Sequence, residues 1–277
     1  MSTPFTTLLA QLAEAPDGSR LAVTDDWTQG RTLFGGLSAA FCALAGTRAA
    51  GEGLEGPPPP LRSGQFAFVG PASGPLRLST EILRRGKSTV FVQADLHGEA
   101  GLACRAILTF GAARASAIDD IDLAPPTARP IADCPPLHGP GGGPGFTANF
   151  DIRPALEAFS FRPDPANPPA TPLRPDLLLW ARHKDEAAGA GPAALLALAD
   201  VPPPAAIRLM KAPAPISTMT WMVDLFEPPP AESDSGWRLL RSSAELTREG
   251  YSSQAMALWD ETGRPLAIGR QNVAVFG

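Results

Sequence analysis

The sequence predicts an α+β fold built from two related units, each a helix lying on an antiparallel sheet, with the two sheets joined edge to edge. Three observations predict it. The chain contains an internal repeat. Each copy of the repeat belongs to a run of predicted strands, with alternating apolar residues, that follows a predicted helix. A segment rich in Pro and Gly separates the two halves. Edge-to-edge pairing is expected because it removes two exposed sheet edges.

The repeat is the strongest of these observations. Residues Leu76–Thr89 read LRLSTEILRRGKST and residues Leu240–Ser253 read LRSSAELTREGYSS, so seven of fourteen positions are identical at an offset of 164. About one match is expected by chance. After a two-residue slip in the next turn, both copies close on Phe-Gly, at residues 110–111 and 276–277. The chain is therefore two related halves.

Both halves show the same order of elements. A helical stripe in the first half is formed by Leu37, Phe41 and Leu44. The second helix opens with Pro192 in its first turn, and a run of prolines after Val201 ends it. Alternation of apolar residues predicts the strands. The expected ranges are strand 20–24, loop 27–36, helix 37–50 and strands 63–69, 74–84, 88–96 and 102–110, then strands 149–153 and 177–182, helix 192–200 and strands 217–226, 236–247, 252–260 and 266–276.

These elements divide the chain into an N-terminal unit at 1–114, a linker at 115–148 and a C-terminal unit at 149–277. The linker contains the run PPLHGPGGGPG, which favours neither helix nor strand. A second stretch rich in Pro, at 161–175, is expected to be a surface excursion of the C-terminal unit.

Composition excludes several classes of function. The formal net charge of -5 disfavours a nucleic-acid partner. No apolar run is long enough to span a membrane, and the first residues lack the pattern of a signal peptide. Cys42, Cys104 and Cys134 have no metal-ligand spacing, so no metal is expected and a reduced, cytoplasmic state is the simplest interpretation. No nucleotide-binding fingerprint is present, so no cofactor is expected.

Short motifs in both halves resemble one known family. The run GRTLFGG at residues 30–36, which opens an Ala-rich helix, resembles the first half of the acyl-CoA thioesterase II family of double-hotdog proteins. The second half is similar at Asp200 at the end of its helix, Thr218 at the start of the next strand, and Gln271 in the last strand. The resemblance implies a double hotdog, whereas periodicity alone also allows other helix-on-sheet units. The chain departs from the family in its short connection from Asp200 to Thr218 and in its long linkers.

The resemblance also implies an activity. Members of the family use an Asp, a Ser or Thr, and a Gln to activate a water that hydrolyses an acyl-CoA to free acid and thiol. Asp200, Thr218 and Gln271 would then be the catalytic set. The two-residue slip aligns Gln271 with Arg105 in the first copy, which suggests that one half keeps the catalytic residues while the other serves as a scaffold.

The residue types support this independently. Asp200 ends an apolar helix, where the helix dipole disfavours a negative charge and burial would raise the pKa of the carboxyl. Thr218 and Gln271 each offer a donor and an acceptor to a water. The alternatives are a solvated Asp at a helix end and polar residues that merely form strands.

Gly35 and Gly36 are candidates for substrate binding. Backbone N–H groups at the start of a helix favour negative charge, so this pair could polarise a thioester carbonyl. Close packing of the helix against a strand is the alternative. None of His97, His138 and His183 is placed with an Asp or Cys as a dyad in the sequence.

Two other functions remain open. One is a non-catalytic protein that binds acyl-CoA or acyl groups. The other, less favoured, is a hotdog hydratase, a chemistry that usually needs an acid–histidine pair. The expected partner in each case is an acyl-CoA, and a homo-oligomer is possible.

Overall fold

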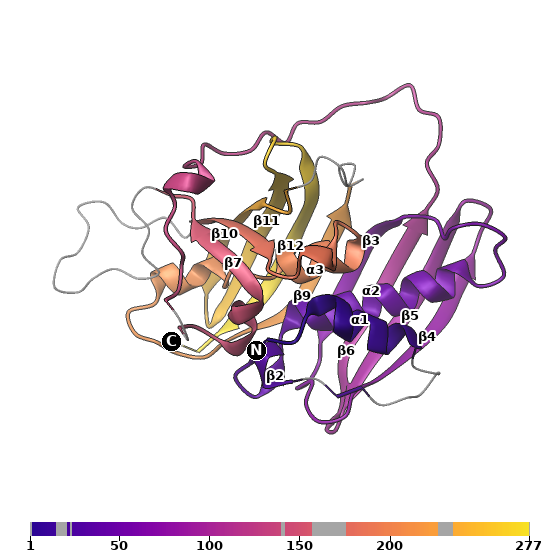
Figure 1. Cartoon of the computed structure of the whole chain (residues 1–277), viewed down its shortest axis with the longest axis horizontal. Coiled ribbons are helices and arrows are strands. Elements are labelled where there is room, and N and C mark those ends of the chain that lie inside the picture. Colours follow the sequence, from indigo (N-terminus) through magenta and orange to yellow (C-terminus); the bar gives the residue numbers. More distant parts are fainter. Residues whose placement is uncertain are drawn as a thin grey trace.

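The computed structural model describes residues 2–14, 21–22, 24–139, 142–156, 176–226 and 235–276. Over these ranges the chain forms a continuous ten-stranded antiparallel sheet with helices on one face (Figure 1). The predicted excursion at 161–175 lies outside the described residues. No helix within the described ranges is long and apolar enough to cross a membrane.

The sheet has the predicted two-part arrangement. Across it the strands run in the order β4-β5-β6-β3-β9-β12-β11-β10-β8-β7. The eight strands from β4 to β10 are arranged symmetrically about the junction of β3 and β9, and β8 and β7 extend the sheet beyond β10. At that junction Phe66 pairs with Trp221, and both side chains are buried under the helices. The strands are β3 (Leu61–Phe68), β4 (Arg77–Arg85), β5 (Thr89–Gly98), β6 (Gly101–Gly111), β7 (Phe150–Pro154), β8 (Asp176–His183), β9 (Ile216–Leu225), β10 (Arg238–Arg248), β11 (Tyr251–Asp260) and β12 (Pro265–Val275).

The helices form a layer over one face of the sheet. Helix α2 (Gly35–Gly51) covers the strands of the first half and packs against both α1 (Phe5–Glu14) and α3 (Pro192–Ala199). Helix α2 consists mostly of small apolar residues on all of its sides, because it is enclosed by the sheet and by two other helices. Helix α1 adds to the predicted elements: its Phe5 and Leu8 are buried in the main core.

The connections contain short elements. The predicted loop before α2 forms a hairpin of β1 (Thr28–Gln29) and β2 (Thr32–Leu33) around Gly30, whose φ of +67° suits glycine. Of the strand predicted at 20–24, the structure describes residues 21, 22 and 24, and Leu21 forms an isolated bridge with Leu76. The short 3₁₀ helices are η1 (Asp25–Trp27), η2 (Ile131–Asp133), η3 (Gly145–Asn149), η4 (Glu186–Ala188) and η5 (Ala205–Leu209).

Bulges in the strands fix how the two copies correspond. Strand β4 has a bulge at Leu83 where it pairs with β5, and β10 has one at Glu245 where it pairs with β11. Strand β6 has a bulge at Ala103, and β12 has one at Leu266. Because a bulge is a fixed interruption of the ladder, these positions mark structurally equivalent residues.

Counting from these bulges corrects the alignment of Gln271 with Arg105. Gln271 corresponds to Leu108, and its cross-strand neighbour Gln254 corresponds to Val92, which pairs with Leu108. Arg105 points to the opposite face of the sheet, where its side chain is 48% exposed, whereas Gln271 is buried under the helices. Residues on opposite faces cannot be equivalent in a strand.

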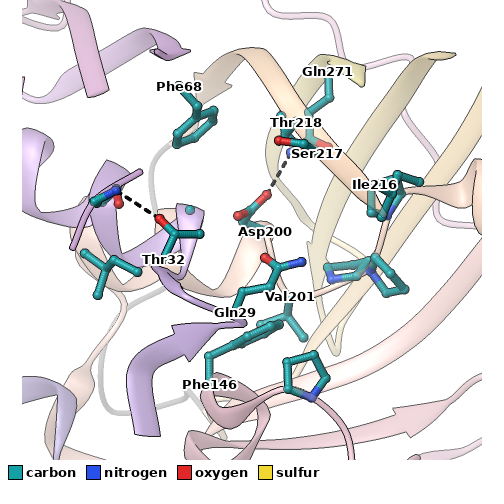
Figure 2. A pocket seen from close by; sticks show the side chains of 18 of the residues that line it. Gln29, Thr32, Phe68, Phe146, Asp200, Val201, Ile216, Ser217, Thr218 and Gln271 are labelled. Carbon is teal, nitrogen blue, oxygen red and sulfur yellow. Dashed lines mark hydrogen bonds between the residues drawn. The ribbon is translucent and has the colours of Figure 1, made fainter. Parts of the chain in front are cut away.

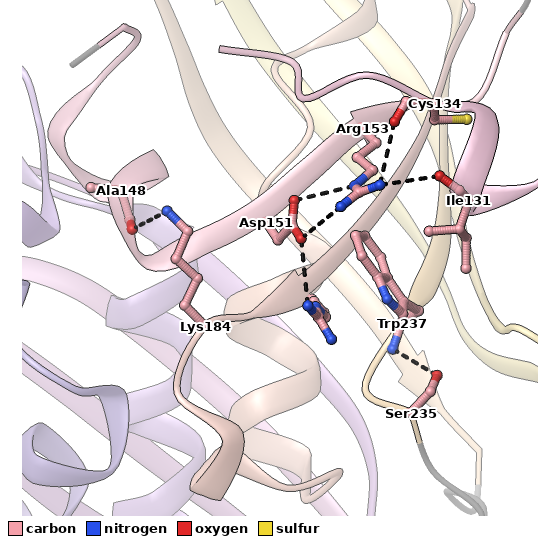
Figure 3. Close-up of polar contacts among 9 residues, drawn as sticks. Ile131, Cys134, Ala148, Asp151, Arg153, Lys184, Ser235 and Trp237 are labelled. Carbon is pink, nitrogen blue, oxygen red and sulfur yellow. Dashed lines mark hydrogen bonds and ion pairs between the residues drawn. The ribbon is translucent and has the colours of Figure 1, made fainter. Parts of the chain in front are cut away.

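The linker is fastened to the second half by Arg153 on β7 (Figure 3). Its guanidinium donates to the carbonyl oxygens of Ile131 at 3.2 Å and Cys134 at 3.4 Å, and pairs with Asp151 at 3.3 Å. It also lies over the ring of Trp237, 5.1 Å from the centroid. These contacts place the linker beside the C-terminal unit rather than leaving it as a loose tether.

The cysteine and tryptophan side chains belong to the cores of the two halves. Cys42 and Cys104 are free and buried in the main core as small apolar fillers. Cys134 of the linker is free and buried against the second half. All five tryptophans are buried, namely Trp27, Trp180, Trp221, Trp237 and Trp259.

Candidate active site

A cavity of about 660 Å³ opens where the start of α2 meets the end of α3 (Figure 2). Four of the five predicted site residues line it: Gly35, Asp200, Thr218 and Gln271. The two units contribute jointly, because Gly35 belongs to the first and the other three to the second. The rest of the wall is largely apolar and includes Phe68, Leu137, Phe146, Val201, Pro202, Ile207 and Ile216.

Asp200 is placed by the early end of α3. The helix stops at Ala199, Asp200 is its C-cap, and Pro202 follows shortly after. The carboxyl then faces the first turn of α2, so closely that a Cβ on Gly35 would lie 2.7 Å from Oδ2 of Asp200. The dipole of α3 disfavours a charge at this point, and the N-terminus of α2 favours it.

Burial dominates the titration of Asp200. It raises the pKa of the carboxyl from 3.8 to about 7, while a hydrogen bond from Gln271 and the backbone N–H of Gly36 act to lower it. Desolvation disfavours the ionised form, and donors directed at the carboxylate favour it. The result is a carboxyl that exchanges its proton near neutral pH.

Two glutamines lie behind this carboxyl in a continuous chain of hydrogen bonds. Gln271 Nε2 donates to Asp200 Oδ1 at 2.8 Å, and Gln254 Nε2 donates to Gln271 Oε1 at 2.7 Å. The backbone N–H of Ala205 in turn donates to Gln254 Oε1 at 2.9 Å. Gln254 was not among the predicted site residues, since only the strand register shows that it lies opposite Gln271.

Thr218 lies on β9 beside a bulge and pairs with Val273 of β12. It is half-buried and lines the same cavity as Asp200 and Gln271 (Figure 2). In the described part of the chain it makes no direct hydrogen bond to either of them. Its hydroxyl can therefore act on a bound molecule within the cavity, rather than on the carboxyl itself.

Gly35 and Gly36 occupy the first turn of α2, as predicted, but their surroundings differ. A Cβ on Gly36 would lie 2.6 Å from the ring of Phe34 and 2.7 Å from the carbonyl oxygen of Ala197, so this glycine permits close packing of α2 on α3. Only Gly35 is part of the cavity wall. The first N–H groups of a helix have no partner within it, so the N–H of Gly35 suits a ligand oxygen.

The linker supplies one wall of the cavity, a role that its composition did not indicate. Phe146 stacks on Phe34 with ring centroids 4.0 Å apart. His138 also lines the cavity, and burial lowers the pKa of its imidazole. No pattern in the sequence connects His138 with Asp200, because His138 lies in the linker and Asp200 follows α3 in the C-terminal unit.

Comparisons with known proteins agree with this structure. Residues 23–111 match the model of the acyl-CoA thioesterase N-terminal domain, and residues 131–275 match that of the acyl-CoA thioesterase C-terminal domain. No curated protein sequence matches the chain.

Solved structures share the fold over almost the whole length. A hot dog fold protein of unknown function from Alicyclobacillus acidocaldarius is 22% identical, with a TM-score of 0.81 over 100% of this chain and 99% of its own. A candidate thioesterase II from Thermobifida fusca is 21% identical, with a TM-score of 0.75 over 95% and 94%. An acyl-CoA thioesterase II from Mycobacterium marinum is 15% identical, with a TM-score of 0.64 over 96% and 97%. The chain thus adopts the double-hotdog fold and belongs to the acyl-CoA thioesterase family.

Proposed function

We propose that the protein hydrolyses acyl-CoA thioesters to a free acid and a thiol, with water activated by Asp200, Thr218 and Gln271. The family supports thioesterase activity in general. The single observation that carries the proposal is the carboxyl of Asp200, which is half-buried and desolvated by the surrounding protein, hydrogen-bonded to Gln271 and open to a cavity with apolar walls.

The pKa of Asp200 suits a general base. A base works best when its pKa lies near the operating pH, because it is then both ionised and basic enough to take a proton. An ordinary aspartate, with a pKa near 3.8, would be a weak base towards water, whereas burial brings Asp200 to about 7. The carboxyl therefore has a protonation equilibrium matched to neutral solution.

The proposed reaction has two steps. Asp200 takes a proton from a water while the water oxygen attacks the thioester carbonyl carbon, giving a tetrahedral oxyanion. The carbon–sulfur bond then breaks, and the thiolate takes the proton from Asp200. Thr218 and the second N–H of the Gln271 amide would orient the water, and the backbone N–H of Gly35 is the candidate donor to the carbonyl oxygen. The N–H of Gly36, predicted from the sequence for the same role, is instead directed at the Asp200 carboxylate. The apolar wall, including Phe68 and Phe146, suits an acyl chain.

The test is a thiol-release assay with a panel of acyl-CoAs of increasing chain length. The proposal expects release for at least one chain length, with a rise of kcat/KM centred on pH about 7 that levels off once Asp200 is fully ionised. Binding of acyl-CoAs without release at any pH would instead assign the cavity to a non-catalytic acyl-binding protein. The three free, buried thiols suit the reducing cytoplasm expected for such an enzyme.

A hydratase is the second candidate, favoured by one observation. His138 and Asp200 line the same cavity, and hydration of an enoyl-CoA in this fold usually relies on an acid–histidine pair. A hydratase would add water to a 2-enoyl-CoA without releasing thiol, and His138→Gln would abolish that addition. The thioesterase proposal expects thiol release to survive this substitution.

A further inference from the structure

Gln254 is a fully buried amide at a position that is apolar in the other half of the chain. It lies on β11, directly across from Gln271 on β12. The corresponding pair in the first half is Val92 and Leu108, both fully buried. Burying an amide is unfavourable unless its polar atoms are hydrogen-bonded, so its presence beneath the candidate site calls for a physical reason.

The direction of the hydrogen-bond chain is fixed at its far end. The backbone N–H of Ala205 can only donate, so the atom of Gln254 that faces it must be the carbonyl oxygen. The NH₂ of Gln254 then faces Gln271 and can only donate, which requires the oxygen of Gln271 at that point. The NH₂ of Gln271 is thereby left to face Asp200. A backbone group thus determines an amide orientation that would otherwise be ambiguous.

We propose that Gln254 is a positioning residue that holds the Gln271 amide in the orientation that donates to the carboxylate of Asp200. With the Gln271 amide reversed, its oxygen would face the carboxylate and repel it. Gln254 therefore favours the ionised form of the base without touching substrate. This inference rests on the proposed function, in which Asp200 is the base.

Few other groups act on Asp200. The first turn of α2 presents backbone N–H groups, of which that of Gly36 favours the carboxylate. On β12, Arg270 points to the open face of the sheet and pairs there with Glu245. Among the described residues of the cavity wall, His138 is the other titratable side chain, and burial lowers the pKa of its imidazole, which favours the uncharged form. A change at Gln254 should therefore reach Asp200 through Gln271.

The test replaces Gln254 by Met, which has a similar length and no amide. The titration of Asp200 is followed by ¹³C-NMR of its carboxyl, and the pH profile of thiol release is measured alongside. We expect the pKa of Asp200 to rise by about one unit. In thiol release, kcat/KM should fall about tenfold at pH 6 and recover above pH 8. Val92→Ala, at the equivalent position of the first half, should lower stability. It should change neither the midpoint of the Asp200 titration nor the midpoint of the pH profile of thiol release. An unchanged Asp200 titration in folded Gln254→Met would overturn the proposal.

A second pair of variants tests the route of action. The first variant is Gln271→Leu, which introduces the residue found at Leu108 in the first half. The second variant adds Gln254→Val, which introduces the residue found at Val92. If Gln254 acts through Gln271, the two variants titrate Asp200 at the same pH. A further shift in the double variant would show that Gln254 acts by another route and would refute the proposal. The NMR titration needs no turnover, so a wild type that releases no thiol would refute the proposed function while Gln254 is still tested.

Discussion

The two halves of the sheet differ most clearly at one cross-strand pair beneath the helices. In the first half this pair is Val92 and Leu108, and in the second it is Gln254 and Gln271. All four side chains are buried, and the bulges in the flanking strands place them at equivalent positions. The same backbone position is therefore used as core in one unit and as part of a candidate site in the other.

The helices above the pair account for this difference. Helix α2 continues over Leu108, and Gly46 leaves room for that side chain. Helix α3 ends early, and its C-cap Asp200 takes the corresponding place above Gln271. Shortening one helix thus exchanges an apolar contact for a hydrogen-bonded carboxyl and opens a cavity beside it. The fold thus requires that these two cross-strand positions be occupied by well-packed side chains, whether apolar or polar. The proposed chemistry depends on where α3 ends, because this places Asp200.

The largest effect is expected at Asp200. Asp200→Asn keeps the shape of the side chain but removes the base, so kcat should fall by about 10²–10⁴-fold with little change in KM. Acyl-CoA thiol release checks this. Asp95→Asn is the control in the first half, because Asp95 pairs with Arg105 away from the cavity, and its kcat should match the wild type. Equal rates for Asp200→Asn and wild type would exclude Asp200 as the base.

The two aspartates should also affect stability with opposite dependence on pH. The folded pKa of Asp200 is raised to about 7, so its cost to stability is absent below about pH 4 and complete above 7. Relative to wild type, Asp200→Asn should therefore gain about 4 kcal/mol in unfolding free energy as the pH rises across this window. The pKa of Asp95 is lowered by Arg105, so its stabilising effect is present at neutral pH and lost in acid. Asp95→Asn should consequently lose stability at neutral pH. Urea unfolding at several pH values measures both, and parallel curves for the two variants would contradict this prediction.

A smaller effect is expected when the first half's residue is placed in the second. Gln271→Leu removes one group that orients the water and the donor to Asp200, so kcat should fall by about 10–10²-fold. The reverse change, Leu108→Gln, should create no second active site in the first half, so turnover should not increase. It should lower stability, because Gly46 above it offers no side-chain partner. Turnover and thermal unfolding of both variants provide the test. Full activity in Gln271→Leu would show that the amide is dispensable.

The smallest effect concerns the first half alone. A Cβ on Gly46 would lie 2.3 Å from Cδ1 of Leu108, so Gly46→Ala should destabilise the protein by about 1–2 kcal/mol despite the better helix propensity of Ala. In a Leu108→Ala background the same substitution should stabilise, since the added methyl fills the space. Additive effects in this double-mutant cycle would show that the two residues do not limit each other's size.

Much of the fold could be predicted from the sequence because its signals are local. Alternation in 102–110 predicts β6, and the stripe of Leu37 and Phe41 predicts α2. The edge-to-edge sheet follows from the repeat together with the need to protect edges. Asp200 and Gln271 were identified by resemblance, and they prove to share a hydrogen bond. That they carry out catalysis stays a prediction.

The rest depends on register, which the repeat did not reveal. The ungapped sequence match makes Gly86 equivalent to Gly250. The hairpins of the structure instead make Gly86 equivalent to Arg248, two residues away. A shift by two residues keeps every side chain on its own face, so the sequence similarity tolerates it. In the last strand the sequence repeat implies an offset of 166, whereas the bulges give 163, so Gln271 was matched to Arg105, three residues from Leu108 and on the other face. Gln254 was missed because its partners, Gln271 and Ala205, are distant in the chain.

Covalent joining of the units has a consequence for stoichiometry. A symmetric dimer of identical hotdogs must repeat each residue in both copies, so no position could be polar in one and apolar in the other. Joining the copies through residues 115–148 lifts that restriction and allows each to diverge. In the described part of the chain, the polar arrangement occurs in the second unit, completed by Gly35 of the first. The expected saturation point is accordingly one acyl-CoA per chain, half of what two equivalent hotdogs would bind.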